Sequence, residues 1–313
     1  MTGTVNFIWK FKRLISAVCI VLLFNSCNSA SNEETGNAES LRKGTIHISA
    51  DESFKPVIDS QVQVFESSYP EAKIIVHYKP EADCLKDFAV DSIRMVIATR
   101  GFSENEKAFI SDSMGVNPSK LVIAYDAIAV IVNPKSADTL FTMAEIKDLL
   151  QGKSAKKLLP VFDGVNATST VRFVIDSVLK GQSLGANVTA AKSSGEVIDY
   201  VSKTLNAVGF IGVSWVGNKE DTTQLSYLEK VKVAQIESIK EEGVYVSPAQ
   251  YNIYYRRYPM VRDLVYVLKE SMNGVGHGFA YFLTGQRGQL IFKRSYLTPA
   301  QMQLNVRNAA LRE

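Results

Sequence analysis

Short apolar runs alternate with helical patterns along most of this chain, and the alternation limits the folds that are open to it. Residues 45–50 (TIHISA) and 73–78 (KIIVHY) have the periodicity and composition of strands. Residues 55–69 between them open with Lys-Pro and place apolar side chains at helical spacing. The near-continuous apolar run 127–132 (AIAVIV) is typical of a strand inside a parallel sheet. This order of elements predicts an α/β protein.

The same pattern continues towards the end of the chain. Thr142 and Glu145 have the spacing of a capping box at the start of a helix. We expect further strands at 95–99, 208–213 and 261–267, and helices at 105–113, 142–150, 170–179, 194–204, 275–284 and 288–294.

Residues 1–26 have the pattern of an export signal. A basic patch at 10–13 precedes the apolar run 14–24, which is too short to span a membrane comfortably. The run ends in LFNSC, which resembles a bacterial lipobox, so we expect cleavage before Cys27 and a lipid on that cysteine. An ordinary signal peptide or an uncleaved anchor is the alternative. Residues 27–42 are polar and predict a flexible tether, which would leave a periplasmic or cell-surface domain anchored to a bacterial membrane.

Composition argues against several classes of function. The net charge is only +3, and lysine and arginine are scattered, so nucleic acid is not an expected partner. Beyond the first 42 residues Cys84 is the one cysteine, and a lone exported thiol is usually a small buried hydrophobe. The three histidines lack the spacing of metal ligands, and we expect neither a metal nor a cofactor.

Two turns between a predicted strand and a predicted helix are rich in hydroxyl groups. Backbone N–H groups at a helix start, together with hydroxyls, can hold an anion without any catalytic group. The alternative is that these hydroxyls only cap their own helices. The turns are 51–56 (DESFKP) and 166–172 (NATSTVR), and their candidate ligands are Ser53, Phe54, Asn166, Thr168, Ser169 and Thr170.

A third candidate lies at the end of a predicted strand. Thr99 and Arg100 follow the run MVIA, and the guanidinium group can offer a fork of donors to an anion, although a surface ion pair is an equal alternative. Glu81 and Asp83 lie near the same strand ends and would favour a protonated oxyanion, but solvated loop acids are the commoner explanation. No GxSxG elbow, P-loop or HExxH motif is present, which favours binding over catalysis.

Three longer segments resemble the phosphate-binding subunit of bacterial ABC phosphate importers, a family of type II periplasmic solute-binding proteins. Residues 124–153 (AYDAIAVIVNPKSADTLFTMAEIKDLLQGK) are similar to the family's strand, VNP turn, helix and closing GK. Residues 206–216 (NAVGFIGVSWV) resemble its GAIGYVG strand, and 255–298 follow its C-terminal order. The likeness covers nearly all of the chain after residue 43.

The resemblance implies a fold and a set of ligands. The fold is two α/β lobes, each a mostly parallel sheet flanked by helices, joined by two crossover segments, with 43–125 plus 231–313 in lobe 1 and 126–230 in lobe 2. Carried over by position, the family's ligands fall on Ser53, Phe54, Thr99, Arg100, Thr168, Ser169 and Thr170, with Asp83 and Asn166 as weaker candidates.

Some positions depart from the family. Ser169 stands where the family has a glycine, Glu81 falls near a family serine, and Arg100 stands in place of the acid that accepts the phosphate proton in the family. These departures bear on which oxyanion is bound more than on the fold.

The expected function follows from the resemblance. The chain is expected to be a monomeric binding protein, not an enzyme, that captures phosphate and delivers it to an ABC importer permease. The alternatives are another oxyanion (sulfate, molybdate or tungstate), a phosphoryl-transfer enzyme, or a surface adhesion protein that keeps the fold.

Overall fold

The computed structural model describes residues 39–118, 120–164, 168–218, 222–270 and 273–302. Residues 39–313 form a compact unit of their own. One large sheet runs through this unit, with strand order β2-β1-β3-β12-β4-β8-β6-β7. A second, three-stranded sheet has the order β11-β10-β5. The strands are β1 Gly44–Asp51, β2 Ala72–Lys79, β3 Ile93–Ala98, β4 Lys120–Val132, β5 Leu140–Phe141, β6 Leu159–Phe162, β7 Thr189–Ala190, β8 Ala207–Gly212, β9 Lys232–Val233, β10 Gln235–Glu237, β11 Tyr245–Val246, β12 Val261–Leu268 and β13 Thr298–Pro299.

Helices cover the sheet and alternate with its strands, which confirms the α/β prediction. The α-helices are α2 Lys55–Ser68, α3 Glu81–Asp87, α4 Glu104–Met114, α5 Met143–Leu150, α6 Ser169–Phe173, α7 Ser194–Lys203, α8 Thr222–Lys230, α9 Gln250–Tyr254, α10 Val275–Thr284 and α11 Gln286–Arg294. Short 3-10 turns η1 (Glu52–Phe54) and η3 (Val213–Trp215) follow β1 and β8, and the π-turn η2 (Val174–Val178) continues α6. The capping box of Thr142 and Glu145 is present at the start of α5.

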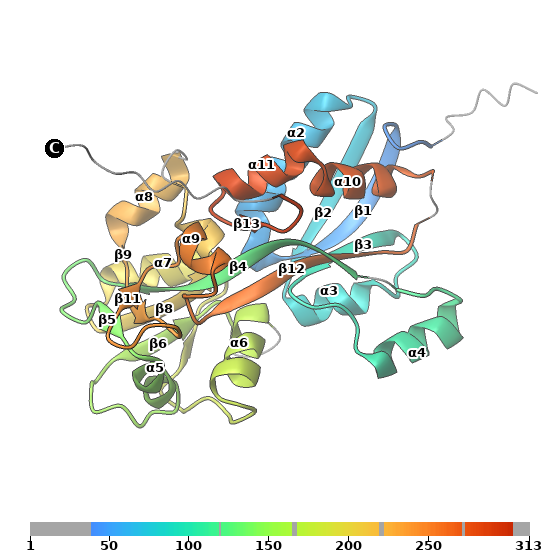
Figure 1. Ribbon diagram of the computed structural model, residues 1–313. Coiled ribbons are helices and arrows are strands. Elements are labelled where there is room, and N and C mark those ends of the chain that lie inside the picture. The colour runs from blue at the N-terminus through green and yellow to red at the C-terminus, as the bar shows by residue number, and fades with distance from the viewer. Residues whose placement is uncertain (1–38, 119, 165–167, 219–221, 271–272, 303–313) are drawn as a thin grey trace, which may run out of the picture. The chain divides into compact units, whose positions relative to one another are not determined.

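Strand β4 is shared between two halves of the large sheet. Its first part, up to Ala127, pairs with β12, and its second part, from Ile128 to Val132, pairs with β8. Strands β2, β1 and β3 therefore lie on one side of the crossing and β8, β6 and β7 on the other. We call these halves the first lobe and the second lobe. Figure 1 shows β4 and β12 running between the two halves, with α3 beside the first and α6 beside the second.

The apolar run 127–132 lies in β4, but the prediction of a parallel environment for it is wrong. β4 runs antiparallel to both β12 and β8. All six side chains are fully buried because β4 lies in the middle of the sheet with both faces covered. A continuous apolar run indicates that a strand is buried on both faces. Parallel strands usually are, but an antiparallel strand in the middle of a covered sheet is buried in the same way.

The return of the chain to the first lobe comes late in the sequence. β9 still pairs with β4 at Ile131 and Val132, and β10 pairs with β5. The chain rejoins the first lobe at β12, which begins at Val261 and pairs with β3 and with the first part of β4. We therefore propose that the second lobe extends to about Met260, beyond the boundary at 230 that the sequence suggests.

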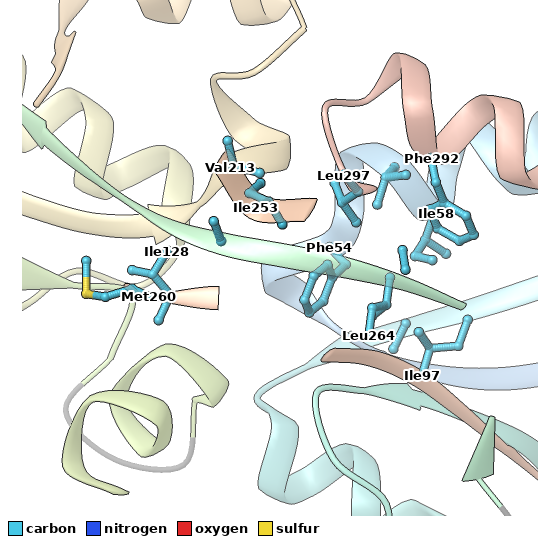
Figure 2. Close-up of a cluster of buried hydrophobic side chains, with 14 of the residues drawn as sticks. Phe54, Ile58, Ile97, Ile128, Val213, Ile253, Met260, Leu264, Phe292 and Leu297 are labelled. Carbon is cyan, nitrogen blue, oxygen red and sulfur yellow. The ribbon is translucent and has the colours of Figure 1, made fainter. Parts of the chain in front are cut away.

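A continuous cluster of buried side chains joins the two halves on both sides of β4 (Figure 2). Phe54, Leu264 and Phe292 fill the first-lobe side, and Ile128 and Val213 continue the cluster towards the second lobe. Cys84 is fully buried and unpaired in a separate cluster under β3, as expected for a small hydrophobe.

Replacement of Phe65 by alanine should test how far this core depends on aromatic packing. Phe65 is fully buried and lies 5.1–5.4 Å, centroid to centroid, from Tyr69, Phe279 and Phe282. We expect Phe65→Ala to lower the free energy of unfolding by about 3–5 kcal/mol in urea denaturation. The exposed Phe109 is the control, because Phe109→Ala should cost no more than about 0.5 kcal/mol. Equal losses in the two variants would contradict this account.

Candidate functional site

The hydroxyl of Ser53 is directed away from its own helix. Asp51, at the end of β1, caps η1 by accepting a hydrogen bond from the Ser53 N–H at 3.0 Å. Phe54 is the N-cap of α2 and makes no side-chain cap bond. The Ser53 hydroxyl instead donates to Asp163 Oδ2 at 3.3 Å and lies 3.4 Å from Ser169 Oγ. The first predicted turn therefore faces the second lobe instead of capping α2.

The second turn uses its three hydroxyls in two ways. Thr168 is the N-cap of α6, and its Oγ1 accepts a hydrogen bond from the Val171 N–H at 3.3 Å. Ser169 and Thr170 are fully buried, and their hydroxyl oxygens accept from Arg262 Nη1 at 2.8 and 3.3 Å. Only one of the three hydroxyls is thus needed as a cap, and two face a buried cation.

Arg262 lies at the centre of this group, and it was not among the residues predicted from the sequence. Its guanidinium is fully buried, donates from Nε to Asp126 Oδ2 at 2.8 Å and lies 4.9 Å from the centre of the Phe54 ring. Burial alone would lower the pKa of Arg262, but the charge of Asp126 raises it, so the group stays protonated. Its Nη2 has no hydrogen-bond partner among the described residues. A Cβ at Gly212 would lie 3.2 Å from this Nη2, so the glycine leaves it room.

Three carboxyl groups next to these hydroxyls have lost most contact with water. Asp163 Oδ2 accepts from Ser194 Oγ at 3.1 Å, and the same hydroxyl lies 3.3 Å from Glu52 Oε2. Burial raises the pKa of Asp51 to about 6. Burial, with the charges of Asp163 and Asp51, raises the pKa of Glu52 to about 7. The cluster therefore carries more potential negative charge than one arginine balances.

Thr99 belongs to a second group of contacts between the lobes. Its N–H and its hydroxyl donate to Glu81 Oε1 at 2.8 and 2.5 Å. Arg172, on α6, donates from Nε to Glu81 Oε2 at 2.5 Å and from Nη2 to Thr99 Oγ1 at 2.6 Å. Glu81 is therefore buried and paired, and the expectation of a solvated loop acid is wrong for it. Asp83 is half-exposed and pairs with Lys86 at 2.9 Å, so it is solvated as expected, but it lies in the first turn of α3 and not in a loop.

Arg100 adopts the ion-pair alternative. It donates to both carboxylate oxygens of Glu106, at 2.8 and 3.1 Å, and to the carbonyl of Gly101. Its contact with a ligand stays a prediction.

Asn166 and Cys27 lie outside the described residues. Within the described ranges, no group of three potential ligands that could hold a metal ion is found, and no helix is long and apolar enough to cross a membrane.

Comparisons with known proteins agree on the fold. A family model described as a PBP superfamily domain matches residues 35–287. Among curated proteins, no sequence shows a significant match. Solved structures that resemble the chain include a putative phosphate ABC transporter substrate-binding protein with bound phosphate from Clostridium perfringens (21% identity, TM-score 0.69, covering 82% of this chain and 100% of that one). An ABC-type phosphate transport receptor from Vibrio cholerae is similar at 15% identity and TM-score 0.59, covering 82% and 100%.

The fold is also shared with proteins of another role. The regulatory domain of MetR, a LysR family regulator from N. meningitidis, matches at 10% identity and TM-score 0.51, covering 82% of this chain and 99% of that one. Identities this low show the fold alone. The two-lobed type II periplasmic binding protein fold expected from the sequence is confirmed.

The raised pKa values of Asp51 and Glu52 predict how stability depends on pH. Both carboxyls ionise at their ordinary pKa values in the unfolded chain. Between those values and pH 6–7, the folded protein therefore binds more protons than the unfolded chain does. Raising the pH from about 5 to about 8 should therefore lower the free energy of unfolding by roughly 1–3 kcal/mol. Urea denaturation at several pH values measures this, and Glu52→Gln should flatten the upper part of the curve. A Glu52→Gln curve as steep as that of the unchanged protein would refute the assignment.

Proposed function

Because the chain belongs to the PBP superfamily, we propose that it is an extracytoplasmic solute-binding protein that captures phosphate between its two lobes. Two of the similar structures are described as phosphate transport proteins, and one of them holds phosphate. The resemblance of the sequence to the phosphate-binding subunit of importers points the same way. The residues proposed as ligands are the hydroxyl groups of Ser53, Ser169 and Thr170 together with Arg262.

The observation that carries this proposal is a buried donor lying among buried acceptors without partners. Arg262 Nη2, Asp51 Oδ2 and Asp163 Oδ1 are all buried and have no hydrogen-bond partner among the described residues. Unpaired buried polar atoms are costly, and native proteins rarely keep several of them in one place without a reason. A ligand that both accepts and donates hydrogen bonds would satisfy all three.

The charges of the cluster favour a protonated oxyanion over a fully ionised one. Asp51, Asp126 and Asp163 lie around one fully buried arginine, and burial raises the pKa of each of these carboxyls. A dianion with no hydrogen would meet carboxylate oxygens that it can only repel. Phosphate near neutral pH keeps at least one hydrogen that it can donate to Asp51 or Asp163. Sulfate, molybdate and tungstate lack that hydrogen and are therefore the less favoured ligands.

The proposed mechanism is capture by closure. Ser53 belongs to the first lobe, Ser169 and Thr170 belong to the second, and Arg262 lies on a strand that crosses between them. Only the closed arrangement brings all four to one ligand, so binding favours closure. We propose that the loaded protein then delivers phosphate to an ABC importer permease as a monomer, without catalysis. The lipid on Cys27 would hold it at the membrane surface.

Titration calorimetry of residues 39–313 with four oxyanions tests the choice of ligand. Phosphate should bind with micromolar or tighter affinity, and sulfate, molybdate and tungstate about a hundredfold more weakly, because each would leave a buried acceptor unpaired. Tighter binding of one of the other three would reassign the ligand. No detectable binding of any of the four would favour a surface protein that has kept only the fold.

Substitutions in the cluster test the proposed contacts. Thr170→Ala and Ser53→Ala should each weaken phosphate binding by about 1–3 kcal/mol, the cost of leaving a buried polar group unpaired. Arg262→Lys keeps the charge but loses the fork of donors, so its loss should be at least as large. Ser111→Ala, an exposed hydroxyl on α4, is the control and should bind like the unchanged protein. Unchanged affinity in all three cluster variants would place the ligand elsewhere.

Replacement of Cys27 tests the proposed anchor. In bacteria that process lipoproteins, the unchanged chain should appear in the membrane fraction and incorporate labelled palmitate. Cys27→Ser should abolish the label and move the protein into the soluble fraction or leave an unprocessed precursor. Labelling of the Cys27→Ser variant would rule out lipidation at this residue.

A further inference from the structure

The contacts of Glu81 differ in kind from those of the proposed phosphate ligands, because they join the two lobes through protein atoms alone. Glu81 begins α3 in the first lobe, and Arg172 lies on α6 in the second. Their ion pair of 2.5 Å is completed by the Arg172 Nη2 bond to Thr99 Oγ1. None of these bonds needs a ligand atom in order to form.

The Glu81 carboxylate has the environment of a bound anion. Its side chain is 2% exposed, and it accepts hydrogen bonds from a backbone N–H, a hydroxyl and a guanidinium. Burial would raise the pKa of Glu81, but the hydrogen bond and charge of Arg172, with help from Thr99, leave it below its ordinary value. Glu81 therefore stays charged and depends on a cation from the opposite lobe.

The two partners would respond differently to opening of the lobes. Arg172 is 31% exposed at its side chain, donates also to Asp176, and can turn to water. Glu81 would keep both donors of Thr99 in its own lobe and gain water in place of Arg172. Closed lobes without Arg172, in contrast, would leave a buried carboxylate without its countercharge, which is among the costliest changes in a protein.

We propose that Glu81 and Arg172 form a latch that holds the two lobes closed without help from a ligand and so sets how fast a ligand enters. The inference rests on the proposed function only in taking the space between the lobes as the ligand's place. A ligand can enter only while the latch is open, so the association rate constant should scale with the open fraction. Arg172 lies on the same short helix as the proposed phosphate ligands Ser169 and Thr170, so the pair would act on these ligands through lobe closure.

Distances between spin labels in the ligand-free protein test the latch directly. In residues 39–313 the native Cys84 is fully buried, so nitroxides can be placed selectively on Asp112→Cys in α4 and Ser177→Cys in η2, both exposed. We expect the unchanged pair to give mainly the short, closed distance. Glu81→Gln should raise the ratio of open to closed forms about tenfold, because the remaining Arg172 can reach water. Arg172→Met should raise this ratio about a hundredfold, because it leaves the buried Glu81 carboxylate without its countercharge in the closed form.

The double variant and a matched control make the result specific. Glu81→Gln with Arg172→Met removes the stranded charge and should be less open than Arg172→Met alone. Glu270→Gln is the control: Glu270 is equally buried, with a side chain 3% exposed, and it pairs with a partly exposed arginine, Arg94, within the first lobe. It should leave the distances unchanged. Circular dichroism shows whether each variant is folded.

Ligand kinetics supply a second, independent readout. Trp215 is the sole tryptophan of residues 39–313, and its Nε1 donates to the Ser53 carbonyl at 2.8 Å, so its fluorescence can follow phosphate binding. The association rate constant should rise about tenfold in Glu81→Gln. Unchanged distances in folded Arg172→Met would overturn the latch. If the spin-label distances change in the variants as expected but the unchanged protein does not bind phosphate, the latch is supported and the proposed ligand is wrong.

Discussion

The buried pair of Arg262 and Asp126 is the constraint on which the rest of the site depends. The two residues are cross-strand neighbours on β12 and β4, the strands that cross between the lobes. Both are buried, and moving such charges out of water costs several kcal/mol per ion unless each finds close partners. The register of two long antiparallel strands supplies those partners. It thereby places a guanidinium where hydroxyls from both lobes can reach it.

Once this cation is in place, the neighbouring residues follow from what it requires. Ser169 and Thr170 satisfy one side of the guanidinium, the Phe54 ring covers its face, and Gly212 leaves room beside Nη2. The acids Asp51 and Asp163 lie close enough for its charge to oppose the rise of their pKa values. The site is thus built from side chains around a buried charge. A part for the free amides of the helix ends, which the sequence suggests as donors, stays a prediction.

The predictable part of the site is the part that is local in sequence. Ser53 and the Thr168–Thr170 turn could be found because each lies between a recognisable strand and helix. Arg262 could not, because it stands within an apolar strand and its partner Asp126 is separated from it by most of the second lobe. A charged residue inside such a strand was the available signal. Glu81 was interpreted as a loop acid because α3 is short and follows Pro80, which hid its helical pattern. The direction of β4 was missed because burial on both faces looks the same in parallel and antiparallel sheets.

The two arginines of the site have different parts in any motion of the lobes. Arg262 and Asp126 lie on the crossing strands themselves, so their pair can persist while the lobes rotate about those strands. Arg172 and Glu81 lie away from the crossing, on helices of opposite lobes, so their pair must break when the lobes part. A permanent pair suits a residue that positions a ligand, since its geometry does not change. A pair that breaks suits a residue that controls access, since the ion pair stabilises only the closed form. The burial of Glu81 makes this second pair selective for the closed form, because its carboxylate is screened by water only when Arg172 has left it.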